Sequence, residues 1–171
     1  MTATPTYRKN SHCAYCGHPF AADQPWPRRC ANCNNMTFVN PLPVTIVLVP
    51  VDNGLLLVRR NIEPHKGKLA LPGGFIDLGE SWQEAGAREV LEETGITIDP
   101  AGITLVTVFS APDGTIIVVS QAAQMQSADL PDFVLNEEAT ERGFIDSPQE
   151  LAWPLHTQAV TAYFALRGQT V

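Results

Sequence analysis

What the sequence most clearly lacks is a long apolar segment. The chain has 171 residues and contains no apolar run of 18 or more, so no part of it is expected to span a membrane. Basic residues are also scarce, because 11 Lys and Arg face 18 Asp and Glu for a net charge of −7. An acidic chain is poorly suited to tight non-specific binding of nucleic acid, which depends on neutralising phosphates. Repeats and low-complexity tracts are absent, and a hydrophobic content of 44% can form a packed core.

The acidic excess is confined to the later part of the chain. Residues 1–40 carry four basic residues and one acidic residue, a balance of +3: Arg8, Lys9, Arg28, Arg29 and Asp23. Residues 41–171 carry seven basic and 17 acidic residues, a balance of −10. The two prolines in residues 40–43 indicate a connecting segment between these parts. We therefore expect two domains, residues 1–40 and residues 41–171, and the basic first part leaves contact with nucleic acid open.

The only four cysteines form two Cys-x-x-Cys pairs, Cys13 with Cys16 and Cys30 with Cys33. The 13 residues between the pairs give a spacing typical of a zinc ion bound by four thiolates. No apolar secretion signal precedes Cys13, so we expect a reducing cytoplasm, where structural disulfides are rare. Four thiolates leave no open position for a reactive water. The sequence therefore predicts a small N-terminal zinc ribbon whose Zn²⁺ is structural.

A group of glutamates forms the second constellation. Glu89, Glu92 and Glu93 are three and four residues apart, which on a helix places them within about a third of the circumference. Like charges at this spacing destabilise a helix, and a divalent cation bound to them would offset the repulsion. Oxygen ligands suit Mg²⁺ or Mn²⁺. We therefore expect a divalent metal site on this helix.

The limits of that helix follow from local signals. Ser81 and Glu84 have the spacing of a capping box, and Gly95 suits the left-handed turn that ends a helix. The apolar positions at helical spacing predict a core-facing stripe opposite the acids: Ala87, Val90, Leu91 and Thr94.

Residues 74–96 resemble the Nudix box, whose pattern is Gly-x5-Glu-x7-Arg-Glu-U-x-Glu-Glu-x-Gly-U with U aliphatic. All constrained positions match: Gly74, Glu80, Arg88, Glu89, Val90, Glu92, Glu93, Gly95 and Ile96. Agreement at nine positions within 23 residues is hard to attribute to chance. The resemblance implies an α/β/α sandwich with a mixed β-sheet. It also implies an enzyme that hydrolyses a nucleoside diphosphate linked to another group.

The resemblance further implies roles for individual residues. The ligands of the catalytic Mg²⁺ or Mn²⁺ would come from the turn and the helix: Gly73, through its carbonyl, Glu89, Glu92 and Glu93. Glu80 would be an auxiliary carboxylate, and Arg88 would orient a glutamate of the cluster through a bidentate contact. Gly74 would let the backbone approach the metal or the phosphates closely.

Two further roles stay open on sequence grounds. Related enzymes take a general base from a loop beyond the box, and alignment of the strand that follows favours Glu138 or Glu141 over Glu137. Solvated loop acids are an equal alternative for each. Arg59 and Arg60 could bind a terminal phosphate of the substrate, or lie solvated on an edge strand.

The remaining elements are predicted from periodicity and turn residues. Apolar runs indicate strands at residues 44–49, 55–59, 69–71, 103–109, 115–122 and 143–145. The first two flank an Asp-Asn-Gly turn at residues 52–54, which predicts that they pair as a hairpin. Residues 147–150 resemble the start of a short helix, and a last helix is expected over residues 156–167.

A zinc ribbon before a Nudix domain is similar to two groups in the family. One comprises NADH pyrophosphatases, which also remove NAD caps from RNA, but their Ser-Gln-Pro-Trp-Pro-Phe-Pro motif is missing here. The other acts on FAD and ADP-ribose, and residues 59–67 resemble its members. We therefore expect hydrolysis of ADP-ribose, FAD or NAD(H) with release of AMP, in the cytoplasm and without a membrane partner. The family also includes many homodimers, although no surface in this sequence indicates one.

Two alternatives belong to other classes. An RNA-end processing hydrolase would use the ribbon to bind nucleic acid, and the acidic charge of the later domain argues against it. A non-catalytic Nudix ligand sensor would show a degenerate box, and the complete box argues against that.

Overall fold

The structure, a computed structural model, describes residues 9–168 and separates into two compact units. The first unit ends at Pro41 and the second begins at Leu42. None of the helices among residues 9–168 combines the length and the apolar composition that a membrane span requires. The assignment of residues 1–40 as a separate zinc-ribbon domain before a Nudix domain at residues 41–171 stays a prediction.

The first unit is built from two turns with the same hydrogen-bond pattern. In one turn, the amide of Gly17 donates to the carbonyl of Cys13 at 3.0 Å; in the other, the amide of Asn34 donates to the carbonyl of Cys30 at 3.0 Å. Gly17 and Asn34 occupy the left-handed region, with φ of +72° and +61°. Asparagine tolerates this conformation better than most side chains do. A short antiparallel pair, β1 (Arg28–Arg29) with β2 (Met36–Thr37), flanks the second turn.

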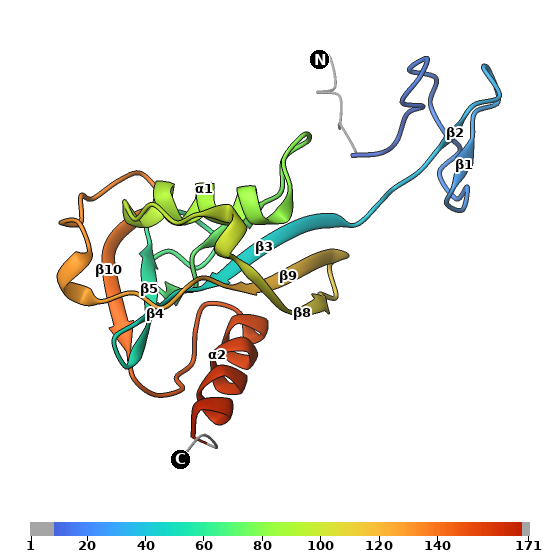
Figure 1. The fold of residues 1–171 in the computed structure, drawn as a ribbon. Helices are drawn as coiled ribbons and strands as arrows, with labels where there is room; N and C mark the ends of the chain where they lie inside the picture. The colour runs from blue at the N-terminus through green and yellow to red at the C-terminus, as the bar shows by residue number, and fades with distance from the viewer. Residues whose placement is uncertain (1–8, 169–171) are drawn as a thin grey trace. The chain divides into compact units, whose positions relative to one another are not determined.

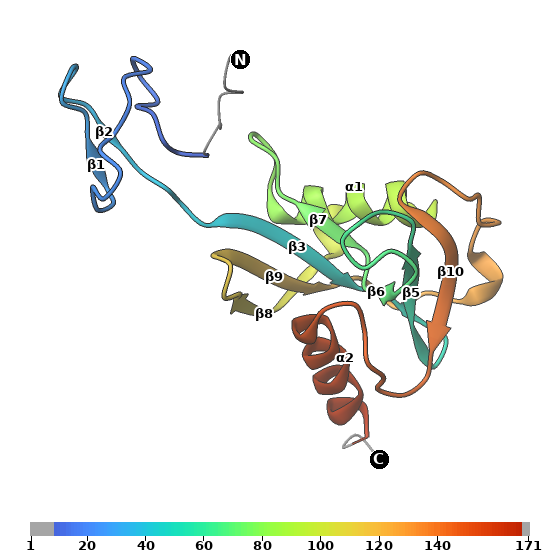
Figure 2. The same cartoon turned by 180° about the vertical axis from the view of Figure 1, so that it is seen from behind.

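The second unit contains two four-stranded sheets and two main helices. Its elements are β3 (Leu42–Leu48), β4 (Pro50–Val51), β5 (Gly54–Arg60), β6 (Leu69–Ala70), β7 (Gly73–Phe75), α1 (Trp82–Thr94), β8 (Thr104–Ser110), β9 (Thr115–Gln121), β10 (Ala139–Ile145) and α2 (Pro154–Arg167), with one-turn 3-10 helices at Pro100–Gly102 and Ser127–Asp129. The mixed sheet has the order β7-β3-β9-β8, in which β3 and β9 run parallel. The other sheet has the order β10-β5-β4, with β6 also paired to β5 (Figures 1 and 2).

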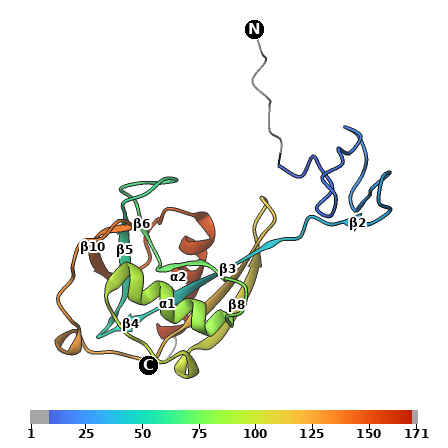
Figure 3. The same ribbon diagram turned by 90° about the horizontal axis from the view of Figure 1, so that it is seen from above.

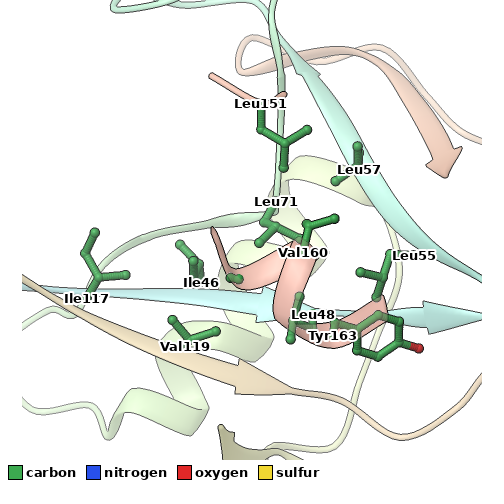
Figure 4. Packing of buried hydrophobic residues seen from close by; sticks show 11 residues of the cluster. Ile46, Leu48, Leu55, Leu57, Leu71, Ile117, Val119, Leu151, Val160 and Tyr163 are labelled. Carbon is green, nitrogen blue, oxygen red and sulfur yellow. The ribbon is translucent and has the colours of Figure 1, made fainter. Parts of the chain in front are cut away.

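The helices cover opposite faces of the strands, as Figures 1 and 3 show for α1 and α2. Successive residues of a strand point to opposite faces, so β3 supplies both cores. Ile46 and Leu48 join the cluster that contains Val160 and Tyr163 of α2 (Figure 4). Val47 of β3 and Val49, one residue beyond the end of the strand, join the cluster that contains Val90 of α1. The predicted α/β/α sandwich with a mixed sheet is therefore confirmed.

The predicted hairpin between residues 44–49 and 55–59 is wrong in its pairing. The turn at residues 52–54 exists, and Asp52 has a φ of +50°, but the pairing with β5 across it is short: it consists of strand β4 and a hydrogen bond from the amide of Leu56 to the carbonyl of Val49 at 3.0 Å. Strand β3 instead lies between β7 and β9, which use both of its edges and leave none for β5. Strand β3 also begins at Leu42, inside the segment expected to be a connection.

No helix forms at residues 147–150, which corrects the second local prediction. The chain there runs without regular structure, and helix α2 begins only at Pro154. The amide of Ala152 donates to the carbonyl of Leu69 at 2.8 Å, and the amide of Leu151 donates to Oγ1 of Thr157 at 3.0 Å. A helix at residues 147–150 would need the amides of Leu151 and Ala152 to donate to residues 147 and 148. Because these amides donate to Thr157 and Leu69 instead, no helical turn forms there.

Helix α1 begins and ends where the sequence predicts. Ser81 Oγ accepts from the Glu84 amide at 3.2 Å, and the Glu84 carboxylate accepts from the Ser81 amide at 2.7 Å, which completes the capping box. Gly95 follows the helix with a φ of +75°.

The face of α1 that packs on the sheet agrees only in part with the predicted one. Val90 and Thr94 are buried as predicted, but Leu91 is 47% exposed, and Ala85, Glu89 and Glu93 are buried as well. The reason is Gly86: a Cβ there would lie 3.0 Å from Cγ2 of Val47, so the helix approaches β3 most closely on this side. Glu89 and Glu93 therefore lie on the packed face of α1, whereas Glu92 is exposed.

Candidate active site

Three carboxylates converge where α1 meets the loop before β10. Glu89, Glu93 and Glu138 each place an oxygen within 4.8 Å of the other two. Glu89 is 8% exposed and Glu93 only 3%, whereas Glu138 is exposed to solvent. Glu92, predicted as a third helix ligand, lies outside this group and is directed to Arg88. Three acids at this separation suit a hard divalent cation such as Mg²⁺ or Mn²⁺, which prefers oxygen ligands.

The environment of the two buried acids disfavours their negative charge. Burial, together with the charges of Glu89 and Glu138, raises the pKa of Glu93 to about 8. The amide of Gly73, which donates to Oε2 of Glu93 at 3.0 Å, opposes this shift. Burial also raises the pKa of Glu89, with Arg88 opposing. A bound cation would favour the ionised form of both carboxyl groups, so the donor set fits a metal.

The glycines of the turn before the helix leave room for these acids. Gly73 has a φ of +152°, and a Cβ there would lie 2.2 Å from the carbonyl oxygen of Thr45. A Cβ on Gly74 would lie 2.3 Å from Oε1 of Glu89. Both positions therefore require glycine, because a Cβ would collide with the Thr45 carbonyl oxygen at Gly73 and with the Glu89 carboxylate at Gly74. Metal ligation by the Gly73 carbonyl stays a prediction.

Arg88 links several acids of the box at once. Its guanidinium makes a two-point contact with Glu80, from Nη2 to Oε1 at 2.7 Å and from Nε to Oε2 at 3.2 Å. Nη1 donates to Glu89 at 2.8 Å and to Glu92 at 3.1 Å. The bidentate contact predicted for a cluster glutamate therefore falls on Glu80, and Glu89 receives a single bond. The hydrogen bonds from Arg88 lower the pKa of Glu80, which keeps that carboxylate ionised.

The structure separates the two loop glutamates that the sequence left as alternatives. Glu138 lies in the carboxylate group, whereas Oε1 of Glu141 accepts from Nε of Arg59 at 2.6 Å. Glu141 faces Arg59 across the β5–β10 pair, and the pairing register shifts between Ala139 and Glu141. Glu138 is therefore the loop acid that can act with the helix acids.

Asn136, which the sequence analysis did not single out, positions this loop. Its Nδ2 donates to the carbonyls of Glu92 at 3.0 Å and Glu93 at 3.4 Å, at the end of α1. Its Oδ1 accepts from the amides of Glu138 at 2.9 Å and Ala139 at 2.8 Å. One side chain thus joins the helix to the segment that carries Glu138. The available signal was the Asn itself, because asparagine side chains often accept a hydrogen bond from the backbone amide two residues further on and so stabilise a turn.

The two arginines of β5 have different surroundings. Arg59 is engaged by Glu141 and by the carbonyl of Gly67, to which its Nη1 donates at 2.8 Å. Arg60 donates from Nε to the carbonyl of Pro64 at 2.9 Å, and its guanidinium lies 4.5 Å from the centre of the Trp153 ring. The positive charge of Arg60 also opposes the raised pKa of Glu93. Arg60 is therefore the cation of β5 whose charge acts on the acid cluster.

The four cysteines of the first unit form a second candidate metal centre. Their sulfur atoms all lie within 4.8 Å of one another, and the pairs Cys13–Cys33 and Cys16–Cys30 are each 3.6 Å apart. Sulfurs about 2.3 Å from a tetrahedral zinc ion would be about 3.8 Å apart. The distances are far too long for disulfides and fit a four-thiolate site. Side-chain amides of Asn32 and Asn35 donate to Cys16 and Cys33, which supports thiolate charge.

The sandwich fold and the carboxylates that converge from the second half of α1 and the loop before β10 define a Nudix-type domain. The sequence agrees, because residues 40–161 match the family model described as the NUDIX domain. The chain belongs to the Nudix family.

Curated relatives and solved structures extend this comparison. The NAD-capped RNA hydrolase NudC of Klebsiella pneumoniae is 33% identical over 125 residues, which is 66% of this chain and 48% of that protein. NudC of Edwardsiella ictaluri is 34% identical over 93 residues, 54% of this chain and 36% of that protein. The matched region thus spans about half or less of these relatives.

Among solved structures, a NUDIX hydrolase from Nitrosomonas europaea superposes with a TM-score of 0.75 over 94% of this chain and 93% of that chain. At 22% identity, this likeness concerns the fold alone. A bifunctional NMN adenylyltransferase/ADP ribose pyrophosphatase from Francisella tularensis, solved with AMP and manganese, is 30% identical. It has a TM-score of 0.55 and covers 63% of this chain and 34% of that chain.

Proposed function

We propose that this protein is a divalent-metal-dependent pyrophosphohydrolase that cleaves the diphosphate of a nucleoside diphosphate linked to another group, with release of AMP. The observation that carries the proposal is the convergence of Glu89, Glu93 and Glu138, two of them buried, beside the Gly73 amide. Buried carboxylates are costly unless a cation or donors compensate for them. A bound Mg²⁺ or Mn²⁺ would compensate for the negative charge of these carboxylates.

The proposed chemistry assigns a separate task to each group. Glu89, Glu93 and the Gly73 carbonyl would hold the cation, which when bound lowers the pKa of water and neutralises the diphosphate. Water attacks one phosphorus, the bridging P–O bond breaks, and the second phosphate leaves with the bridging oxygen. Glu138 is the exposed carboxylate of the group, so it is suited to accept the proton of the attacking water.

Residues around the acids would hold the substrate and the acids themselves in place. Arg60 places a positive charge near Glu93 and is suited to bind a phosphate oxygen that the cation does not neutralise. Arg88, held by Glu80, fixes the position of Glu89. Arg59 is already paired with Glu141, so it is the weaker candidate for substrate binding.

The substrates that fit best are ADP-ribose, FAD and NAD(H). Support comes from the name of the Francisella tularensis relative, which includes ADP ribose pyrophosphatase, and from the likeness of residues 59–67 to FAD and ADP-ribose enzymes. The name of the Klebsiella pneumoniae relative favours capped RNA as a second candidate substrate. Zn²⁺ in the four-thiolate site would be structural, and a cytoplasmic location would keep those thiols reduced.

A substrate panel tests the proposal. The protein is incubated with ADP-ribose, FAD, NADH and NAD-capped RNA, each with Mg²⁺ or Mn²⁺, and AMP or the uncapped 5′ end is quantified by chromatography. We expect at least one member to be hydrolysed only when the divalent ion is added, and Glu93→Gln to remove most of that activity. Absence of hydrolysis for every member by folded, metal-loaded protein would refute the proposal and favour a ligand sensor.

A further inference from the structure

The first unit contains a cavity that its zinc site does not explain. The cavity has a volume of about 260 Å³, and its lining includes Lys9, Phe20, Trp26 and Arg28. None of the four cysteines is among the lining residues, and a closed four-thiolate shell takes no further ligand. A cavity lined by two aromatic side chains in so small a unit is therefore a candidate binding site for another ligand.

An arginine and two aromatic rings form one side of the cavity. The guanidinium of Arg28 lies 4.4 Å from the centre of the Trp26 ring and 5.6 Å from that of Phe20. Arg28 also donates from Nε to the carbonyl of Gln24 at 2.7 Å, which fixes the cation in place. The rings of Phe20 and Trp26 meet edge to face, with centroids 6.0 Å apart.

The stack of Arg28 on Trp26 is held in place before any ligand binds, but it does not shield the Trp26 ring completely from solvent. Trp26 is still 39% exposed, so part of its indole ring contacts solvent. A flat aromatic ligand that covered this ring would gain stacking energy without first ordering the side chain. Base–aromatic stacking of this kind is a main contribution to affinity in proteins that bind single strands.

Charge identifies the class of ligand. Lys9 and Arg28 line the cavity, and Arg29 is adjacent in sequence, whereas Asp23 is the one acidic residue among residues 9–41. Residues 41–171 in contrast carry a net charge of −10. The positive part of this acidic protein therefore coincides with its solvent-exposed aromatic cavity, a combination that suits a stacked base with a phosphate backbone beside it.

We propose that the cavity of the first unit binds single-stranded nucleic acid, with a base stacked on Trp26 and the neighbouring phosphates at Lys9 and Arg28. The site is distinct from the carboxylate cluster of the second unit and does not depend on hydrolysis there. Recognition by stacking requires an unpaired base, so a duplex should bind much more weakly than a single strand.

Fluorescence anisotropy of the full-length, zinc-loaded protein tests this inference. The probes are a fluorescein-labelled 12-nucleotide oligo(A) RNA, the matching DNA and an RNA duplex, titrated without Mg²⁺ or Mn²⁺ so that no hydrolysis is expected. We expect a single strand to bind with an affinity that falls as salt rises, and Trp26→Ala to weaken binding roughly fivefold to a hundredfold. Trp26→Phe keeps an aromatic ring, so its affinity for the single strand should fall much less.

Two further variants separate the cavity from the rest of the unit. Tyr15→Ala removes an aromatic side chain that is 66% exposed but does not line the cavity, so binding should not change. Lys9→Gln should weaken binding and reduce the salt slope by about one. Because Trp26→Ala could unfold the unit, zinc content is measured for each variant. If Trp26→Ala loses zinc, the affinity of Lys9→Gln alone tests whether the cavity binds the single strand.

Three outcomes would overturn the proposal. They are no binding of either single strand at low salt, equal affinity for single strand and duplex, and unchanged affinity in both Lys9→Gln and zinc-retaining Trp26→Ala. A preference between RNA and DNA would identify which polymer the cavity accepts.

Discussion

The α-carbon of Gly74 faces the Glu89 carboxylate so closely that a Cβ would lie 2.3 Å from Oε1. Gly74→Ala should therefore displace that carboxylate from the cluster and weaken activation by Mn²⁺ roughly tenfold to a hundredfold, as loss of a supporting contact typically does. The measurement is the Mn²⁺ dependence of hydrolysis. Gly102→Ala is a matched control, because a Cβ there meets nothing within 4 Å. Equal Mn²⁺ dependence in both variants would show that Glu89 has no part in binding the ion.

Glu138 and Glu141 offer a direct test of the loop acid. Glu138→Gln should lower kcat by about 10²- to 10⁴-fold, the range typical for loss of a general base. Glu141→Gln loses only its pair with Arg59, and both side chains are substantially exposed, so its kcat should change little. Rates at saturating substrate and Mg²⁺ distinguish the two. A larger loss in Glu141→Gln would reverse the assignment.

The buried carboxyl of Glu93 should make stability depend on pH when Mg²⁺ is absent. Its pKa is about 8 in the folded protein and near 4.5 when exposed, so between these values the folded state binds more protons than the unfolded state. The resulting stabilisation is complete below pH 4.5 and is lost as pH rises through 8. We expect the free energy of unfolding in urea to fall between about pH 6.5 and 8.5.

This window avoids an opposing contribution from His156. Burial lowers the pKa of His156 to about 3 from 6.5, so that side chain raises stability with rising pH, but only below pH 6.5. Glu93→Gln should flatten the dependence above pH 6.5, and saturating Mg²⁺ should stabilise the wild type more at pH 8.5 than at pH 6.5. Identical slopes above pH 6.5 in the wild type and in Glu93→Gln would contradict the burial of this carboxyl.

Replacing one cysteine should release zinc and unfold the first unit. Cys30→Ser removes one of four ligands, and zinc binding contributes most of the folding free energy in such small units. We expect zinc content to fall from about one ion per chain to nearly none, with faster tryptic cleavage at Arg28 and Arg29. Ala31→Ser, an exposed neighbour, is the control. Normal zinc content in Cys30→Ser would rule out a four-thiolate site.

Arg60 should contribute to substrate binding and Arg59 should not. Removal of a charge-assisted phosphate contact in Arg60→Gln should raise KM for the substrate about tenfold or more, with a smaller effect on kcat. Arg59→Gln keeps the Arg60 contacts with Pro64 and Trp153, so its KM should stay close to that of the wild type. Steady-state kinetics on the best substrate of the panel would show the difference.

Features that depend on a few neighbouring residues could be predicted from sequence. The limits of α1 follow from Ser81, Glu84 and Gly95, whose hydrogen bonds and backbone angles are set within one turn. The clustering of the four cysteines also follows from spacing, because each Cys-x-x-Cys pair fits one tight turn.

Features that depend on distant segments could not be predicted. The packed face of α1 is determined by the close approach of Gly86 to Val47, which belongs to another element. The predicted pairing of β3 was wrong because the sequence near a strand does not show which other strands will occupy its edges. Glu138 could not be separated from Glu141 because the register shift in β10 breaks the alternation that would assign their faces.

The double attachment of Asn136 has a consequence for how turnover proceeds. Since one amide group ties the end of α1 to the backbone of Glu138 and Ala139, the loop acid is already beside the helix acids before any ligand arrives. Assembly of this cluster therefore requires no lid closure over the substrate. Loop motion should not limit the catalytic rate, and solvent viscosity should affect only substrate entry and product departure.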